Sequence, residues 1–212
     1  QYPEAARLAC AIADDVCAHR FLFRDHWEME RTHEPVQFGP REQDIDWACI
    51  PAGDPEWLYA MNRHTSFVNL AKAWRLTGDE RYAQHYARLI AEVGVRVQKG
   101  QDVVIEAELD QPEFVTMVAD ACYHAGARKV TVTWKHQALE KLAIRRESVK
   151  TLQTVEAWER AKLQHYVDTL PCRIYLLSEG PDGLRGVSPA KMARARQGRY
   201  GVIKPYRDQM EG

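Results

Sequence analysis

The sequence predicts an α/β protein in two parts, an N-terminal α-helical segment followed by a parallel-sheet α/β domain. Up to about residue 93, apolar residues recur mainly at three- and four-residue spacing, which is typical of amphipathic helices. After Gly94 the pattern changes to short β-branched runs that alternate with helical stretches. This alternation predicts parallel strands joined by right-handed crossovers.

Three helices are predicted in the N-terminal part, at residues 3–19, 56–77 and 80–93. Gly78 is expected to end the second helix in a left-handed conformation, and Asp79 to cap the third. The residues from 20 to 55 are rich in proline and glycine, so we expect an irregular connection there.

The C-terminal part is predicted to alternate strands and helices. The β-branched runs favour strands, and Pro189 fits the first turn of the last helix. Strands are expected at residues 102–108, 129–134 and 173–178, and helices at 111–125, 137–143, 155–169 and 188–196.

Composition excludes several classes of protein. The 212 residues are 45% hydrophobic and 28% charged, as in ordinary globular domains. A formal net charge of -1 lacks the basic footprint of a general nucleic-acid binder. No apolar run approaches the ~18 residues of a membrane span, and the N-terminus shows no leader pattern. We therefore expect a cytoplasmic protein with no nucleic-acid and no membrane partner.

The cysteines and histidines show no metal-binding spacing. The five cysteines are odd in number and widely spaced, with no CxxC, so we expect reduced and mostly buried thiols. His124, His136 and His165 fall on separate predicted helices or their starts, and none belongs to an H-E-x-x-H motif. The sequence thus predicts no metal site.

Several blocks after residue 85 follow one another in a characteristic order. They are Tyr86-Ala87-Arg88-Leu89-Ile90, Gly94-Val95-Arg96-Val97-Gln98-Lys99-Gly100-Gln101, Val103-Val104-Ile105, Phe114-Val115, Tyr123-His124-Ala125-Gly126-Ala127, Val132-Thr133-Trp134 and Gly186-Val187-Ser188-Pro189. In this order they resemble the N-terminal domain of the M29 (thermophilic-type) metallo-aminopeptidases.

The M29 resemblance implies a hydrolase that removes N-terminal residues from peptides with two divalent metals. In that family the Glu, His and Asp ligands lie in a C-terminal domain, and this sequence ends at Gly212, before that domain. The resemblance therefore implies a truncated domain without a cofactor, catalytic residue or metal ligand of its own, and inactive alone.

The N-terminal part carries a second set of blocks. They are Arg20-Phe21-Leu22-Phe23, Asp44-Ile45-Asp46-Trp47, Asn62-Arg63-His64 and the run from Ala71 to Ala83. These blocks resemble the N-terminal helical domain of heparinase II/III-type polysaccharide lyases, which begins an α/α toroid. The resemblance implies cleavage of acidic polysaccharide by β-elimination, with catalytic residues that come later in the toroid than this sequence follows it.

The two resemblances meet inside the predicted helix at residues 80–93. We therefore predict a helical heparinase II/III-like segment at residues 1–85 and an M29-like α/β domain at residues 86–212, joined as a chimera of truncated fragments. Recombination, mis-assembly of a gene and artificial construction all fit this pattern. Without toroid neighbours, the helices of the segment are expected to pack loosely on the α/β domain or to self-associate.

Asn62, Arg63 and His64 are the candidate substrate-binding residues. On the predicted helix, Arg63 and His64 could face a groove and contact a sugar carboxylate. The alternative is a packing or solvated position between Met61 and Phe67, and it is favoured because a groove needs helices that the segment lacks.

Other polar groups have an ordinary structural interpretation that is favoured over a functional one. Asp44 and Asp46 could hold a metal, but loop carboxylates are more often caps or turn formers. Glu106, Glu108 and Asp110 end the first strand of the predicted sheet, where open α/β sheets place ligands, yet solvation of a strand end explains them too.

Basic residues gather in two stretches, where a solvated surface is favoured over polyanion binding. One is the aromatic-rich run at residues 20–33, and the other is the C-terminal set of Arg194, Arg196, Arg199, Lys204 and Arg207. The glycine-containing loop at residues 180–186 lacks a phosphate-binding pattern.

Three functions remain open at this point: an M29-like peptidase domain, a polysaccharide lyase fragment, and a non-catalytic interaction or oligomerisation module. Peptide or acidic polysaccharide is the ligand that the resemblances imply, and a homo-oligomer is the partner that the third function implies.

Overall fold

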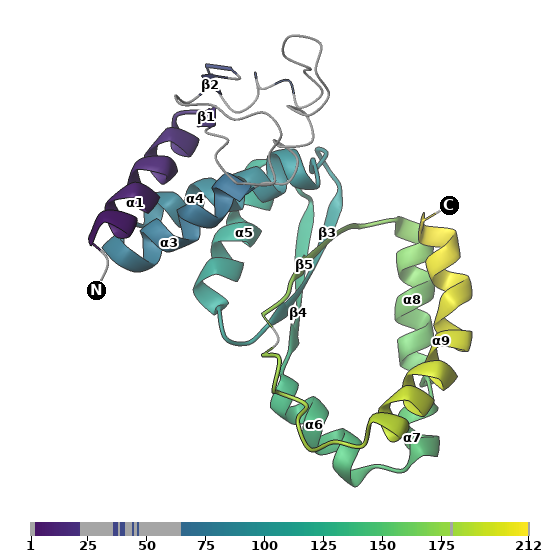
Figure 1. Ribbon diagram of the computed structural model, residues 1–212. Helices are drawn as coiled ribbons and strands as arrows, with labels where there is room; N and C mark the ends of the chain where they lie inside the picture. The colour runs from purple at the N-terminus through teal and green to yellow at the C-terminus, as the bar shows by residue number, and fades with distance from the viewer. Residues whose placement is uncertain are drawn as a thin grey trace, which may run out of the picture. The chain divides into compact units, whose positions relative to one another are not determined.

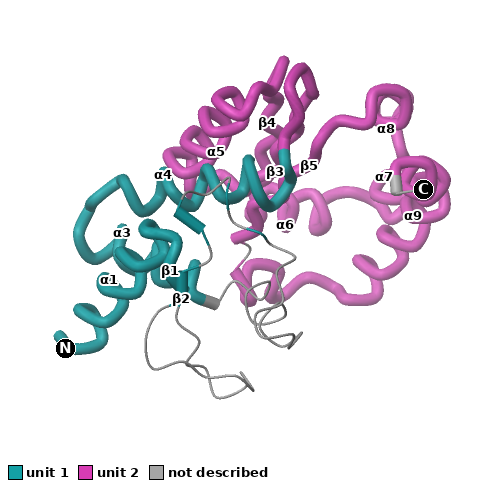
Figure 2. Tube along the Cα trace, turned by 90° about the horizontal axis from the view of Figure 1, so that it is seen from above, with its two compact units in different colours: residues 1–96 teal, residues 97–212 magenta. Residues whose placement is uncertain are grey.

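The computed structural model describes residues 3–21, 36–37, 39–40, 44, 46, 65–178 and 180–211. The chain divides into two compact units, residues 1–96 and residues 97–212 (Figure 2). The predicted fold class is confirmed, since helices dominate the first unit and a three-stranded parallel sheet lies in the second (Figure 1). Among the described helices, none is long and apolar enough to cross a membrane.

Helices make up most of the first unit. Its elements are α1 (Pro3–Cys17), the 3-10 turn η3 (Thr65–Phe67), α3 (Val68–Thr77), α4 (Glu80–Arg88) and the π-helical η4 (Leu89–Gly94). The predicted helix at residues 56–77 is helical from residue 65 onward, and its earlier part lies outside the described residues.

The turn between α3 and α4 follows the prediction. Gly78 has a φ of 71°, and its N–H donates to the Trp74 carbonyl at 2.8 Å. The Asp79 carboxylate then accepts from the Arg81 N–H at 3.1 Å, which caps the N-terminus of α4. Gly78 and Asp79 therefore set the tight connection between the two helices.

Helices α1 and α3 pack against each other in the first unit and bury its core. The fully buried side chains there include Val16, Phe21 and Leu70, and Phe67 is 5% exposed. Trp74 is half-buried against the same cluster. The apolar face of α3 thus finds cover inside its own unit.

A short antiparallel pair corrects the prediction of an irregular connection at residues 20–55. Strand β1 (Arg20–Phe21) pairs with β2 (Val36–Gln37), with Arg20 opposite Gln37 and Phe21 opposite Val36. The prediction was wrong at these positions because a two-residue strand shows no alternation, and burial of Phe21 stabilises the pair.

The sheet of the second unit has the order β4-β3-β5, and all its strands are parallel. Strand β3 (Asp102–Glu108) lies in the middle, between β4 (Lys129–Lys135) and β5 (Cys172–Leu176). The two predicted edge strands agree with the structure to within two residues at each end. In the register, Glu106 lies beside Thr133 of β4 and Tyr175 of β5.

The two faces of the sheet differ in character. Val103 and Ile105 are fully buried, and helix α5 (Pro112–His124) covers their face with Val118 and Cys122. Alternate residues form the opposite side, which we call the polar face. The polar face consists of Glu106, Glu108, Thr133, Lys135, Arg173 and Tyr175.

Helices α6 (Gln137–Arg146), α7 (Val149–Gln153) and α8 (Ala157–Thr169) lie between β4 and β5, and α9 (Pro189–Glu211) follows β5. Helix α9 lies alongside α7 and α8 (Figure 1). The short α7 was not predicted. Helix α9 runs 15 residues beyond the predicted end at 196, although Pro205 lies inside it, because packing along α7 and α8 outweighs one lost hydrogen bond.

Candidate functional site

The polar face of the sheet joins charged residues from all three strands. Glu106 lies at its centre on β3. The carboxylate accepts from the Lys135 ammonium of β4 at 3.0 Å and from the Arg173 guanidinium of β5 at 3.2 Å. The parallel register places one cation on each side of Glu106, so the carboxylate connects both edge strands to the central one.

The environment of Glu106 favours its ionised form. Burial raises the pKa of this carboxyl, and the hydrogen bonds and charges of Lys135 and Arg173 lower it, with a net pKa below the ordinary value. The two cations therefore outweigh the cost of desolvation. Glu106 stays charged at neutral pH and is suited to positioning cations rather than to donating a proton.

Arg173 is held between aromatic rings. Its guanidinium carbon lies 5.1 Å from the ring centre of Tyr175 and 5.8 Å from that of Tyr166 on α8. Lys162, also on α8, donates to the Thr133 hydroxyl at 3.3 Å and lies 5.5 Å from the Tyr166 ring centre. Helix α8 thus adds a cation and an aromatic ring to the polar face.

The three acidic residues predicted around the end of β3 do not act together. Glu106 belongs to the ion-pair cluster, and Glu108 is buried beside Lys135 in the register. Asp110 lies beyond the strand, where its carboxylate accepts from the Ser178 hydroxyl at 2.6 Å. The charged partners Lys135 and Arg173 lower the pKa of Glu106.

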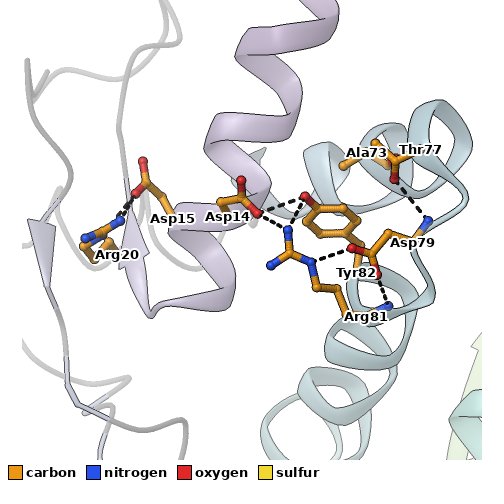
Figure 3. Close-up of polar contacts among 8 residues, drawn as sticks. All are labelled: Asp14, Asp15, Arg20, Ala73, Thr77, Asp79, Arg81 and Tyr82. Carbon is orange, nitrogen blue, oxygen red and sulfur yellow. Dashed lines mark hydrogen bonds and ion pairs between the residues drawn. The ribbon is translucent and has the colours of Figure 1, made fainter.

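A second polar cluster links helices α1 and α4 in the first unit (Figure 3). The Tyr82 hydroxyl donates to the Asp14 carboxylate at 2.9 Å. Arg81 donates to the same carboxylate at 2.5 Å and to Asp79 at 2.7 Å. Beside it, Arg20 pairs with Asp15 at 2.5 Å and ties β1 to α1.

The electrostatics of this cluster point to a structural role. Burial and the hydrogen bond and charge of Asp14 raise the pKa of Tyr82 above its ordinary value, against the opposing effect of Arg81. The hydrogen bond to Asp79 is the largest of the effects that raise the pKa of Arg81. A neutral phenol and a permanent cation suit an inter-helix tie better than proton transfer.

The predicted substrate-binding residues Asn62, Arg63 and His64 lie outside the described residues, so their interpretation stays a prediction. Asp44 and Asp46 are described, but residue 45 between them is not. Within the described ranges, no group of three or more His, Cys, Asp or Glu side chains is placed to hold a metal ion.

The basic C-terminal residues lie on helix α9. Arg199 pairs with Glu159 of α8 at 2.5 Å, and Lys204 pairs with Asp208 one turn later. Helices α6, α7 and α9 line a mainly apolar cavity of about 160 Å³. Its wall includes Ile144 of α6 and Met192 and Ala195 of α9. Arg199 thus ties α9 to α8, whereas the Lys204 pair lies within α9.

Sequence reasoning missed Lys135, Arg173 and Tyr166 as members of the polar face. Their proximity to Glu106 depends on the register of three strands and on the packing of α8, and neither follows from sequence spacing. Alternation within β3 identified Glu106, which was the one available signal.

In comparisons with known proteins, two family models match different parts of the chain. The family model described as thermophilic metalloprotease (M29) matches residues 79–212, and that described as heparinase II/III N-terminus matches residues 5–98. Both resemblances inferred from the sequence are thereby confirmed. The two matches overlap at residues 79–98, in α4 and η4 and just beyond.

Individual relatives agree with these matches. Aminopeptidase AmpS of Bacillus subtilis is 30% identical over 126 residues, which are 59% of this chain and 31% of the relative. Heparin-sulfate lyase of Bacteroides stercoris is 39% identical over 77 residues, which are 36% of this chain and 10% of the relative. The chain therefore spans about a third of the aminopeptidase length.

A solved structure shares the fold. Wild-type AmpT from Thermus thermophilus superimposes with a TM-score of 0.56 and 25% sequence identity, over 62% of this chain and 33% of the other.

Proposed function

Because the chain belongs to the thermophilic metalloprotease (M29) family, we propose that its second unit acts as the N-terminal domain of a metallo-aminopeptidase, which removes N-terminal residues from peptides. The observation that carries the proposal is the parallel β4-β3-β5 sheet, which lies within residues 79–212 that match the family model. The fold shared with the AmpT structure supports it.

The two divalent metals of the family do not fit the described residues of this chain. Within those ranges no group of three or more possible ligands comes together. The acidic residue best placed on the sheet, Glu106, is already paired with Lys135 and Arg173. We therefore propose that the metals bind outside this chain.

A domain exchange tests the proposed function directly. Residues 79–212 would replace the matching 126-residue segment of Aminopeptidase AmpS, and release of leucine from leucine p-nitroanilide would be followed with added cobalt or zinc. We expect metal-dependent activity in the hybrid. A hybrid that folds but is inactive would contradict the proposal.

Two further hybrids would serve as controls. Val104→Asp would place a charge in the sheet, where Val104 is 4% exposed, and should abolish activity by unfolding the domain. Asp182→Asn, at an exposed position in the loop before α9, should leave activity unchanged. The 212-residue chain alone is expected to release no leucine, and metal-dependent release by it would show that it holds its own metals.

The second candidate function is a polysaccharide lyase fragment acting on acidic polysaccharide. It is favoured by the match of residues 5–98 and by the 39% identity to a heparin-sulfate lyase. In this case Asn62, Arg63 and His64 would contact the sugar. Incubation of the chain with heparin should then increase the ultraviolet absorbance of unsaturated uronates, and Arg63→Ala should reduce the increase.

We also propose that the chain is a fusion of the two family segments, since both family models match residues 79–98. Genomic sequence across codons 80–95 tests this, because a frameshift or break in the reads there would reveal mis-assembly.

Self-association as an interaction module is the third proposal, and light scattering after size exclusion would distinguish a dimer from a monomer. A cytoplasmic location remains a prediction from the sequence.

A further inference from the structure

The polar face gathers more cations than its own carboxylates neutralise. Lys135, Lys162 and Arg173 lie around the Glu106 carboxylate or on the ring of Tyr166. Glu108 is the second carboxylate of this face. The three cations thus exceed the two carboxylates by one charge.

Two titratable groups respond to this excess. The pKa of Glu106 is lowered by Lys135 and Arg173 although burial acts to raise it. Burial raises the pKa of Tyr175; Arg173, Lys135 and Arg207 oppose that rise, and Glu106 adds to it. The lowered pKa of Glu106 therefore indicates that the positive potential of Lys135 and Arg173 outweighs burial at this carboxylate.

The guanidinium of Arg173 keeps unused donor capacity. One terminal nitrogen donates to Glu106 at 3.2 Å, and the other approaches the Met210 sulfur at 3.9 Å, which is a weak acceptor. Its Nε is buried and has no acceptor among the described residues. Because Nε is inaccessible, the terminal nitrogen beside Met210 is the donor that remains for a second oxyanion.

The cations remain reachable from solvent. Side-chain exposure is 43% for Lys135 and 28% for Arg173, and Tyr175 is 48% exposed. The site has charge, directed donors and an aromatic wall on rigid strands.

We propose that the polar face binds a small oxyanion, a carboxylate or a phosphate, between Lys135 and Arg173 and against the ring of Tyr175. The site lies in the second unit and requires neither metal nor peptidase activity. Its test is therefore independent of the aminopeptidase and lyase proposals.

Nuclear magnetic resonance of the ¹⁵N-labelled full chain tests the site. Phosphate, N-acetylglycine and N-acetylglycinamide would be titrated at constant ionic strength set by sodium chloride. We expect saturable shifts at the backbone amides of Thr133, Lys135 and Tyr175 with phosphate or N-acetylglycine, and none with the neutral amide. If only one of the two anions gives saturable shifts, that anion shows whether the ligand is a phosphate or a carboxylate. Linear shifts, or equal shifts with the amide, overturn the proposal.

Three substitutions make the result specific. Lys135→Gln should weaken binding by about tenfold, because one exposed cation beside the anion is lost. Glu106→Gln should tighten binding, since it removes the competing carboxylate. Arg194→Gln, at an exposed position on α9, should leave affinity unchanged. Binding that is insensitive to Lys135→Gln in a chain with native circular dichroism, or equally sensitive to Arg194→Gln, overturns the assigned location.

Discussion

Glu106 has one cation on each side because Lys135 and Arg173 lie on the same face of the two neighbouring strands, each two residues from the level of Glu106. Its side chain is only 18% exposed, so the ion pairs are partly shielded from water. Removing the carboxylate would leave two partly buried cations without their shared partner, and such a loss is costly.

We predict that Glu106→Gln lowers the free energy of unfolding by about 1–3 kcal/mol at pH 7. The folded-state pKa of Glu106 lies below the ordinary 4.5, so its stabilisation is present above that pH and is lost as the pH falls through the folded pKa. Urea unfolding at pH 7 and pH 3 should therefore show a smaller difference between the two proteins at pH 3.

Glu113→Gln provides a matched control, because Glu113 is exposed at the start of α5 in the same unit. It should change the free energy of unfolding by less than about 0.5 kcal/mol at pH 7. A Glu106→Gln effect no larger than that of the control would contradict the shared ion-pair arrangement.

The cysteines also show how burial changes the pKa and the reactivity of a single side chain. All four described cysteines are free thiols, as expected, but only Cys122 is buried, whereas Cys10, Cys17 and Cys172 are half-buried. Burial, with a smaller effect of Cys172, raises the pKa of Cys122 to about 11. The expectation of mostly buried thiols was thus too broad.

We predict that Cys122 reacts with a thiol-specific disulfide reagent on the order of a hundredfold more slowly than Cys10 at pH 8, because it is inaccessible and protonated. Peptide mapping after timed labelling would measure both rates. In concentrated urea the two cysteines should react alike. Equal rates in the native chain would show that the Cys122 thiol is not buried between α5 and the sheet.

At the scale of elements, the α3–α4 connection depends on one backbone conformation. Gly78 has a φ of 71°, and a Cβ at this position would meet no atom within 4 Å. Any cost of substitution there therefore comes from the backbone and not from a steric clash.

We predict that Gly78→Ala lowers the free energy of unfolding of the first unit by about 1 kcal/mol, since alanine disfavours the left-handed conformation. Thermal unfolding followed by circular dichroism would measure the change. Gly78→Asn should cost less, because asparagine tolerates this conformation better than alanine. If both variants cost the same, a factor other than backbone conformation determines the loss.

Helix and strand patterns differ in how well the sequence predicts them. Strand β3 was predicted with its observed bounds, because a β-branched run bounded by turns has few alternatives. Helix α9 was predicted too short, since Gly198, Gly201 and Pro205 suggest an end that the neighbouring helices override. For the polar face, the sequence alone marked Glu106 as a candidate residue. Tyr166 contacts Arg173 of this face only because α8 packs there in the tertiary structure.

At the scale of the whole molecule, each unit buries its own core. Leu70 is fully buried in the first unit and Ile105 in the second. The expectation that the N-terminal helices pack loosely on the α/β domain, or self-associate, stays a prediction. The covered face of α3 removes one reason for it, since Phe67 and Leu70 already have neighbours in α1 and β1.

We predict that amides of Leu70 and Ala73 exchange with deuterium slowly, within about tenfold of Val103 and Ile105, because all four residues lie in buried cores. Mass spectrometry of peptides after timed exchange would measure this. The amide of Gly186, in the loop before α9, should exchange much faster. Its rate serves as the reference for an amide that is not protected by a core. Exchange of α3 as fast as that loop would indicate that its core is not stably formed.

The π-helical turn η4 has a consequence for changes in chain length. Its closing bond runs from the Val95 N–H to the Ile90 carbonyl at 3.0 Å, so the turn holds one residue more than an α-helical turn. One residue corresponds to about 100° of rotation along a helix. A single-residue insertion or deletion within Leu89–Gly94 can thus be absorbed by a switch between π and α hydrogen bonding, while α4 keeps its contacts. The segment matched by both family models, residues 79–98, therefore contains a turn that can accommodate a change of one residue in chain length.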